Sequence, residues 1–234
     1  MATAYYMELL IQMTDAACDQ EHLNMIIYNR PDTPDRTRYI LGLSDQNPTG
    51  PMIETGRKLV EQGAECIAIP CITAHYFHEY LEEQVGAPII NLIKETVCHM
   101  KHRGVKTVGL MATDGTVRSK LFQNEIERQG LTAVVPSEEG QAKVMHLIYE
   151  NVKAGRPIEM ELFLEATEEL RSLGAEVIVL GCTELSIIKK NHPIGSGFLD
   201  AMEVLAKVAI EKCQAPLKAE YECLITGWDK PYMD

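Results

Sequence analysis

Two segments of the chain carry the same pattern of residues and end in a cysteine followed closely by a threonine. The first reads GAECIAIPCITAH over residues 63–75, and the second reads GAEVIVLGCTEL over residues 174–185. Both begin Gly-Ala-Glu, continue as an apolar run and reach a cysteine, Cys71 or Cys182. The repetition predicts two similar lobes related by a pseudo-twofold axis, with the two cysteines on opposite walls of one cleft.

Two thiols on opposite faces of one carbon atom can invert the configuration of that carbon. A thiolate removes a proton from one face and a thiol returns a proton to the other, which is general acid–base catalysis by a matched pair. A thiol suits this task because its ordinary pKa, about 8.5, is lowered at helix N-termini and beside cations. Cys71 and Cys182 both precede expected helix starts. The hydroxyls of Thr73 and Thr183, with backbone N–H groups of the turns, are placed to hold a carboxylate.

Other interpretations of the two cysteines are open. A single buried cysteine at a strand end is most often a small core residue. A disulfide between Cys71 and Cys182 is disfavoured in a reducing compartment. A zinc site formed by Cys71, His75 and Cys182 lacks a further paired ligand. The repetition favours the acid–base interpretation for both cysteines together.

The surrounding elements alternate between strands and helices, which predicts an α/β fold with parallel sheets. Ligands bind beyond the carboxyl ends of the strands in such sheets. Expected strands lie at residues 26–28, 66–70, 88–92, 107–111, 131–135 and 177–180. Expected helices lie at residues 2–17, 51–62, 73–84, 94–101, 117–129, 138–154, 159–173 and 201–214.

Two lobes are expected, each a parallel sheet flanked by helices, with the active site in the cleft between them. The first comprises residues 1–102, and residues 198–234 return to it. The second comprises residues 103–197. The boundaries follow from the HRG turn near residues 101–105 and from the proline and two glycines within residues 191–197.

Composition excludes several classes of protein. The net charge of −12, without a basic stripe, argues against a nucleic-acid partner. We find no apolar run of membrane-spanning length and no signal peptide at the start of the sequence. Seven cysteines at scattered spacings do not form a secreted disulfide framework, so a cytoplasmic location is expected.

The sequence resembles the aspartate/glutamate racemase family. The resemblance lies in PCITAH at 70–75 and GCTEL at 181–185 and extends over about residues 2–212. PDRT at 34–37 and IYENVKAG at 148–155 are similar to the aspartate racemase branch. The resemblance implies a two-lobed fold, a homodimer, no pyridoxal phosphate or other cofactor, and no metal.

The resemblance also implies residue roles. Cys71 and Cys182 match the catalytic thiols, and Thr73 and Thr183 match threonines that bind the α-carboxylate of the substrate. Glu184 matches a polar position beside the second thiol. Arg36 and Lys153 match cations that bind a side-chain carboxylate; considered alone, each is more readily explained as a solvated surface charge.

Two departures from the family pattern bear on the site. Ile72 occupies a substrate-binding position where the family usually has asparagine, and loss of such a contact costs about 1–3 kcal/mol of recognition. The family also begins with a strand and a Gly-rich turn of about ten residues before its first helix. This sequence begins at that helix, so the first lobe is expected to lack a central strand.

We therefore predict a cofactor-independent racemase that interconverts L- and D-aspartate, or a related acidic amino acid, by two-cysteine proton transfer. Glutamate racemase, hydantoin racemase and maleate isomerase activities are alternatives within the superfamily, and arylmalonate decarboxylase is weaker because it needs one cysteine. A catalytically idle amino-acid-binding protein is the alternative from another class.

Overall fold

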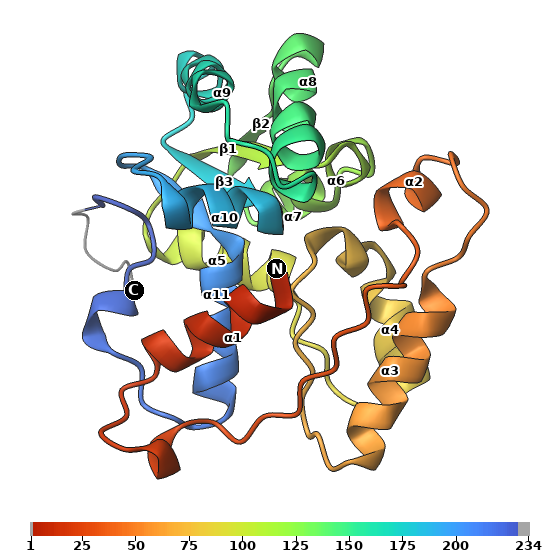
Figure 1. Ribbon diagram of the computed structural model, residues 1–234. Coiled ribbons are helices and arrows are strands. Elements are labelled where there is room, and N and C mark those ends of the chain that lie inside the picture. The colour runs from red at the N-terminus through yellow and green to blue at the C-terminus, as the bar shows by residue number, and fades with distance from the viewer. Residues whose placement is uncertain (1, 229–234) are drawn as a thin grey trace.

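A four-stranded parallel sheet forms the centre of the second lobe (Figure 1). The structure, a computed structural model, describes residues 2–228. The strand order is β2-β1-β3-β4. The strands are β1 (Thr107–Ala112), β2 (Thr132–Val134), β3 (Val177–Gly181) and β4 (Phe198–Asp200). The expected strands at 107–111, 131–135 and 177–180 are confirmed, and β4 was not predicted.

The register of β1 and β3 places two functional segments side by side. Ala112 pairs with Gly181 at the carboxyl ends of these strands, so Thr113 and Cys182 follow at the same edge of the sheet. β3 is buried along its whole length and β1 from its second residue onward. Strands buried on both faces have nearly continuous apolar sequences, as these do.

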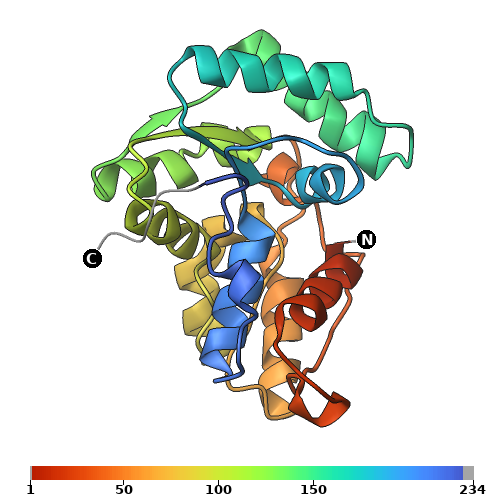
Figure 2. The ribbon, with the colours of Figure 1, turned by 90° about the vertical axis from the view of Figure 1, so that its left-hand side faces the viewer.

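Helices cover both faces of this sheet (Figure 2). On one face, Met111 and Leu180 contact a core formed with three elements: α8 (Glu138–His146), the π-helix η3 (Leu147–Lys153) and α9 (Met160–Ser172). On the other face, Leu110 and Val179 share a core with three further helices, α5 (Leu92–His102), α7 (Leu121–Arg128) and α11 (Ala201–Lys212). Successive residues of a strand point to opposite faces, which explains the division.

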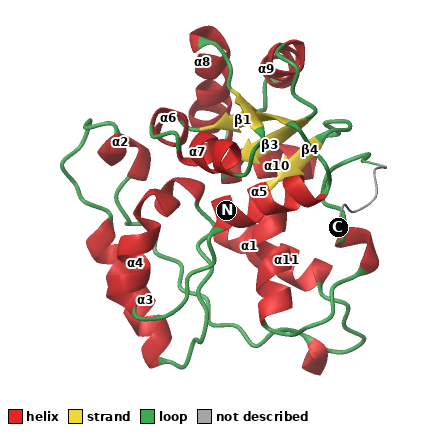
Figure 3. Ribbon diagram, turned by 180° about the vertical axis from the view of Figure 1, so that it is seen from behind, coloured by secondary structure: helices red, strands yellow, loops and turns green. Residues whose placement is uncertain are grey.

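The first lobe is mostly helical (Figure 3). Its α1 (Ala2–Met13) packs on α11, while α3 (Thr49–Glu61) packs on α4 (His78–Val85). Short elements complete the chain: α2 (Arg36–Ile40), α6 (Asp114–Arg118), α10 (Thr183–Asn191), and the 3-10 helices η1 (Asp19–Glu21), η2 (Ile72–Phe77) and η4 (Ala219–Tyr221). The expected long helix at 138–154 is divided into α8 and the π-helix.

The α/β architecture with two lobes is confirmed, but the sheet expected in the first lobe is reduced to one parallel bridge. Ile67 donates to the carbonyl of Pro88 and accepts from the N–H of Ile90, both at 2.9 Å. Pro70 has no N–H with which to extend the ladder. Residues 26–28 run without regular secondary structure, so the strand expected there is absent.

The boundary near residue 198 also differs from expectation. β4 pairs with β3, so the sheet of the second lobe extends to Asp200. We propose that the return to the first lobe begins with α11, which packs on α1 and α5. Within residues 2–228, no helix combines the length and the apolar character that crossing a bilayer requires.

We predict that Leu180→Ala destabilises the protein far more than Leu173→Ala. Leu180 of β3 is fully buried, so its truncation leaves a cavity that costs about 2–5 kcal/mol of unfolding free energy. Leu173 is 51% exposed, and its truncation should change stability by no more than about 0.5 kcal/mol. Urea denaturation of both variants measures the difference. Equal unfolding free energies would contradict the burial described here.

We also predict a pH-dependent contribution of His99 to stability. Its Nε2 accepts from the backbone N–H of Leu224 at 3.4 Å, so the ring is neutral in the folded protein. Burial and the nearby cations, Lys207 first, lower the pKa of His99 from 6.5 to about 3. As the pH falls, His99 of the unfolded chain is protonated before His99 of the folded protein. The free energy of unfolding therefore decreases by about 2 kcal/mol between pH 6.5 and 5.

The measurement for His99 is the unfolding free energy of the wild type and of His99→Gln at pH 7 and pH 5. The variant lacks the titrating ring, so its stability should fall less over this interval. Identical losses in both proteins would show that His99 does not contribute.

Candidate active site

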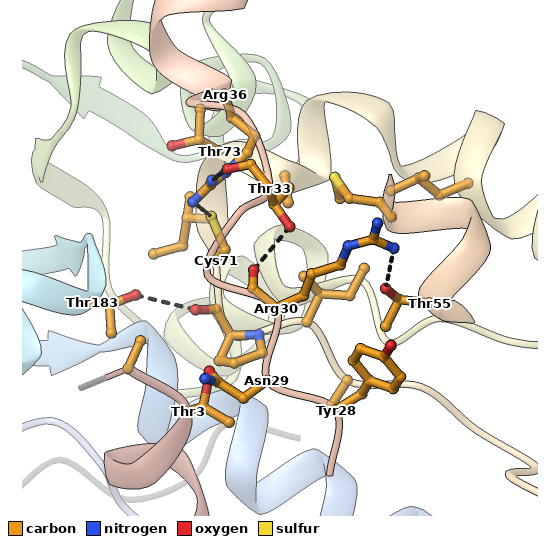
Figure 4. Close-up of a pocket in the computed structure, with 18 of the residues that line it drawn as sticks. Thr3, Tyr28, Asn29, Arg30, Thr33, Arg36, Thr55, Cys71, Thr73 and Thr183 are labelled. Atoms are coloured by element: carbon orange, nitrogen blue, oxygen red, sulfur yellow. Dashed lines mark hydrogen bonds between the residues drawn. The ribbon is translucent and has the colours of Figure 1, made fainter. Parts of the chain in front are cut away.

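The two cysteine motifs meet at one pocket between the lobes. Cys71 and Cys182 both line this pocket. The hydroxyl of Thr183, which follows Cys182, donates to the carbonyl of Pro70, which precedes Cys71, at 3.1 Å (Figure 4). This hydrogen bond joins segments 113 residues apart and brings both thiols to the same cavity.

Each cysteine is the residue that immediately precedes a helix. Cys71 precedes η2 with φ −151° and ψ 104°, and Cys182 precedes α10 with φ −155° and ψ 141°. The similar extended backbone of the two residues matches the repeat seen in the sequence. Since the first N–H groups of a helix have no partner within the helix, both turns present donors beside a sulfur atom.

The surroundings of the two sulfur atoms differ in charge. Nη2 of Arg36 donates to Sγ of Cys71 at 3.4 Å, whereas Sγ of Cys182 donates to Oε2 of Glu184 at 2.8 Å. Burial raises the pKa of the Cys182 thiol well above its ordinary value, and the Glu184 carboxylate raises it further. The negative charge of the Cys71 sulfur raises the pKa of Arg36. The Cys71 sulfur therefore lies beside a positive charge and the Cys182 sulfur beside a carboxylate.

Of the three cationic side chains among the described lining residues, Arg36 and Lys153 reach the pocket from opposite lobes. Arg36 is the first residue of α2, where Asp35 caps the helix by accepting from the N–H of Arg38 at 3.0 Å. Lys153 is the last residue of the π-helix and is solvent-exposed. Although desolvation acts to lower the pKa of Lys153, the negative groups around it, Glu184 first, raise it above its ordinary value. Both side chains are thus positive at neutral pH.

Threonine hydroxyls form a cluster beside Cys71. Oγ1 of Thr73 lies 3.2 Å from that of Thr113 and 3.4 Å from that of Thr116. Thr37 donates to Thr113 at 3.3 Å. Sequence reasoning missed Thr37 and Thr113, although both line the pocket. Their positions in the sequence could have indicated both residues. Thr37 follows Arg36, and Thr113 follows the end of a strand, as Cys182 does.

Ile72 forms part of the apolar wall of the pocket. It is 3% exposed and packs in the same core as Tyr5 and Leu9 of α1. Its side chain supplies no hydrogen bond where the family usually has an asparagine. The polar groups that line the pocket are instead those of the threonines, the cations and Glu184.

The pocket continues past Cys71 into an apolar arm within the first lobe. Its walls are the facing sides of α3 and α4 and the segment around Ile67. The apolar residues that line it are Met52, Leu59, Ile67, Leu81, Val85 and Ile89. At its mouth, Arg30 donates to Glu54 at 2.8 Å and to Thr55 at 3.4 Å (Figure 4). No pattern in the sequence predicted this arm.

The structure gives no support for the zinc alternative. Nε2 of His75 lies 3.3 Å from the carbonyl oxygen of Ile69, and burial lowers the pKa of this ring to about 4. Within residues 2–228, no three potential metal-binding side chains come together.

Known proteins resemble this chain over nearly its whole length. The sequence profile of the Asp/Glu/hydantoin racemase family matches residues 1–209. The broad specificity amino-acid racemase RacX of Bacillus subtilis is 25% identical over 195 residues, which are 83% of this chain and 84% of that protein. A glutamate racemase of Deinococcus radiodurans is 29% identical over 127 residues, covering 54% of this chain and 44% of that protein.

A solved structure shares both the fold and part of the sequence. The aspartate racemase of Picrophilus torridus superposes with a TM-score of 0.79 at 27% identity and covers 95% of this chain and 94% of its own. An aspartate racemase homologue from Pyrococcus horikoshii has a TM-score of 0.72 at 24% identity, covering 91% and 94% of the two chains, and supports the fold. The chain belongs to the Asp/Glu/hydantoin racemase family and is an amino-acid racemase that works without pyridoxal phosphate.

Proposed function

We propose that the protein interconverts the enantiomers of aspartate, or of a related acidic amino acid, by proton transfer between Cys71 and Cys182. The observation that carries the proposal is the electrostatic difference between two thiols in one pocket. Cys71 lies beside the Arg36 guanidinium, and Cys182 donates to Glu184. One sulfur is thus prepared to accept a proton while the other is prepared to donate one.

In the forward direction, the Cys71 thiolate takes the α-proton, so the Cα–H bond breaks and an S–H bond forms. The Cys182 thiol then gives its proton to the opposite face of Cα. The intermediate carries negative charge that extends into the α-carboxylate. Thr73, Thr183 and the N–H groups at the starts of η2 and α10 surround this position and would stabilise that charge.

The reverse direction uses the same groups with exchanged roles. After one forward turnover, Cys71 is a thiol and Cys182 is a thiolate next to Glu184. A buried thiolate beside a carboxylate is unfavourable, which drives Cys182 to recover a proton. The exposed ammonium of Lys153 at the same pocket offsets part of this cost.

Two positive side chains support an acidic substrate. An amino acid with two carboxylates can place its α-carboxylate at the threonines and its second carboxylate between Arg36 and Lys153. Arginine and lysine at this site form charge-assisted hydrogen bonds, which are stronger than neutral ones. The similarity to an aspartate racemase of known structure also supports an acidic substrate.

The apolar arm favours a second candidate function, the racemisation of amino acids with neutral side chains. An apolar side chain that enters the arm would leave Arg36 at the Cys71 sulfur. One relative, RacX of Bacillus subtilis, is named as an amino-acid racemase of broad specificity. A catalytically idle binding protein stays the third possibility. The homodimer, the cytoplasmic location and the absence of a cofactor stay predictions. All seven cysteines are free thiols in the structure.

We predict that Cys71→Ala and Cys182→Ala each lower aspartate racemisation by at least about 100-fold, the lower range for loss of a general acid or base. Cys18→Ala is the matched control, because Cys18 is exposed and outside the pocket. In heavy water, the wild-type product should carry deuterium at Cα while unreacted substrate keeps its proton. Racemisation at the wild-type rate in either pocket variant would refute the two-base mechanism, and no exchange with measurable binding would favour the idle protein.

We predict that Arg36→Leu lowers kcat/KM for aspartate more than for alanine, since only aspartate carries a second carboxylate for this residue. The selectivity ratio should fall by about tenfold, as expected for loss of one charge-assisted hydrogen bond of about 1.5 kcal/mol. The measurement is kcat/KM for both amino acids by chiral chromatography. A ratio equal to that of the wild type would remove Arg36 from side-chain recognition.

A further inference from the structure

Tyr149 lies outside the pocket lining but contacts a residue that lines it. Both Tyr149 and Lys153 belong to the π-helix η3. Nζ of Lys153 lies 3.8 Å from the centroid of the Tyr149 ring, which is cation–π geometry. Among residues 2–228, Lys153 forms no ion pair within 4.0 Å, so the ring is the close partner that restrains its ammonium.

The hydroxyl of Tyr149 reaches across to the first lobe. It donates to Oδ2 of Asp35 at 3.2 Å, and Oδ1 of Asp35 caps the helix that begins with Arg36. One half-buried side chain therefore connects the segment that carries Lys153 with the segment that carries Arg36. These two segments are 114 residues apart in the chain.

The contact between Tyr149 and Lys153 lies within a π-helical segment. A π-turn is rare and occurs frequently at functional sites, because the extra residue alters which side chains share a face. Here it ends at Lys153, at the mouth of the pocket. A lysine has four rotatable side-chain bonds, and holding it in one position costs up to about 2 kcal/mol of conformational entropy. An aromatic ring beside the ammonium offsets part of that cost before the substrate arrives.

We propose that Tyr149 is a positioning residue that holds the Lys153 ammonium at the pocket mouth, with its own ring fixed by the hydrogen bond to Asp35. The proposal rests on the proposed function, because it assigns to Lys153 the side-chain carboxylate of an acidic substrate. Tyr149 does not touch that substrate. Its effect passes through Lys153 and should disappear when Lys153 is absent.

The experiment measures binding of succinate, a dicarboxylate without the amino group and the stereocentre on which racemisation acts, by isothermal titration calorimetry. Tyr149→Leu should weaken binding by about fivefold, the effect of losing a cation–π contact. Tyr149→Phe keeps the ring but removes the hydroxyl that donates to Asp35, so its affinity should lie between those of the wild type and Tyr149→Leu. Tyr80→Leu removes an exposed tyrosine away from the pocket and is the matched control.

A double-mutant cycle separates positioning from a general structural effect. In a Lys153→Met background, Tyr149→Leu should cause no further loss of succinate binding. A loss as large as in the wild-type background, or wild-type affinity in Tyr149→Leu itself, would overturn the proposal. If Tyr149→Leu fails to fold, as judged by its thermal midpoint, Tyr149→Met carries the same test.

Activity distinguishes this inference from the proposed function. A wild type that racemises neutral amino acids and binds no succinate would overturn both the acidic specificity and the role of Tyr149. A wild type that racemises aspartate, with a Tyr149→Leu variant of unchanged KM and unchanged succinate affinity, would overturn only the inference. We expect KM for aspartate to rise about fivefold in that variant and kcat to change less, since Lys153 does not contact Cα.

Discussion

The hydrogen bond from the Thr183 hydroxyl to the Pro70 carbonyl joins the two lobes at residues that flank the two thiols of the pocket, Cys71 and Cys182. It stands at the carboxyl edge of the sheet, where β1 and β3 end in register and deliver Thr113 and Cys182 together. This edge is built from parallel strands with buried faces, while the facing wall comes from a loop and a 3-10 helix. The pocket therefore combines a wall supported by a sheet with a wall held by individual side-chain contacts.

Chemical asymmetry is built on a nearly symmetric backbone. Cys71 and Cys182 have similar extended conformations at the starts of helices, yet a guanidinium contacts one sulfur and a carboxylate accepts from the other. A racemase must remove or return a proton at either face of the substrate's Cα. A similar backbone on both sides of the pocket suits both directions of this reaction. We propose that this charge difference prepares one sulfur to accept a proton and the other to donate one, which a symmetric environment does not do.

Side chains from both lobes set the chemical character of the pocket. Arg36 and Lys153 reach the pocket from different lobes, and the contact from Tyr149 to Asp35 links the segments that carry them. The apolar arm and the buried Ile72 enlarge the apolar part of the pocket. We propose that substrate choice reflects a balance between attraction to these charges and apolar contact in the arm.

The repeat in the sequence identified Cys71 and Cys182, and β1 and β3 were predictable because strands buried on both faces are continuously apolar. The short strand β4 was not, because three residues carry too little pattern. Arg36 and Lys153 were identifiable only by family resemblance, since single charged residues do not reveal what they face. Tertiary structure decided the loss of the first-lobe sheet, the threonine cluster, the apolar arm and the contact at Tyr149. It also decided the charge around each thiol, because the guanidinium beside Cys71 belongs to a residue 35 positions away that only folding brings within reach.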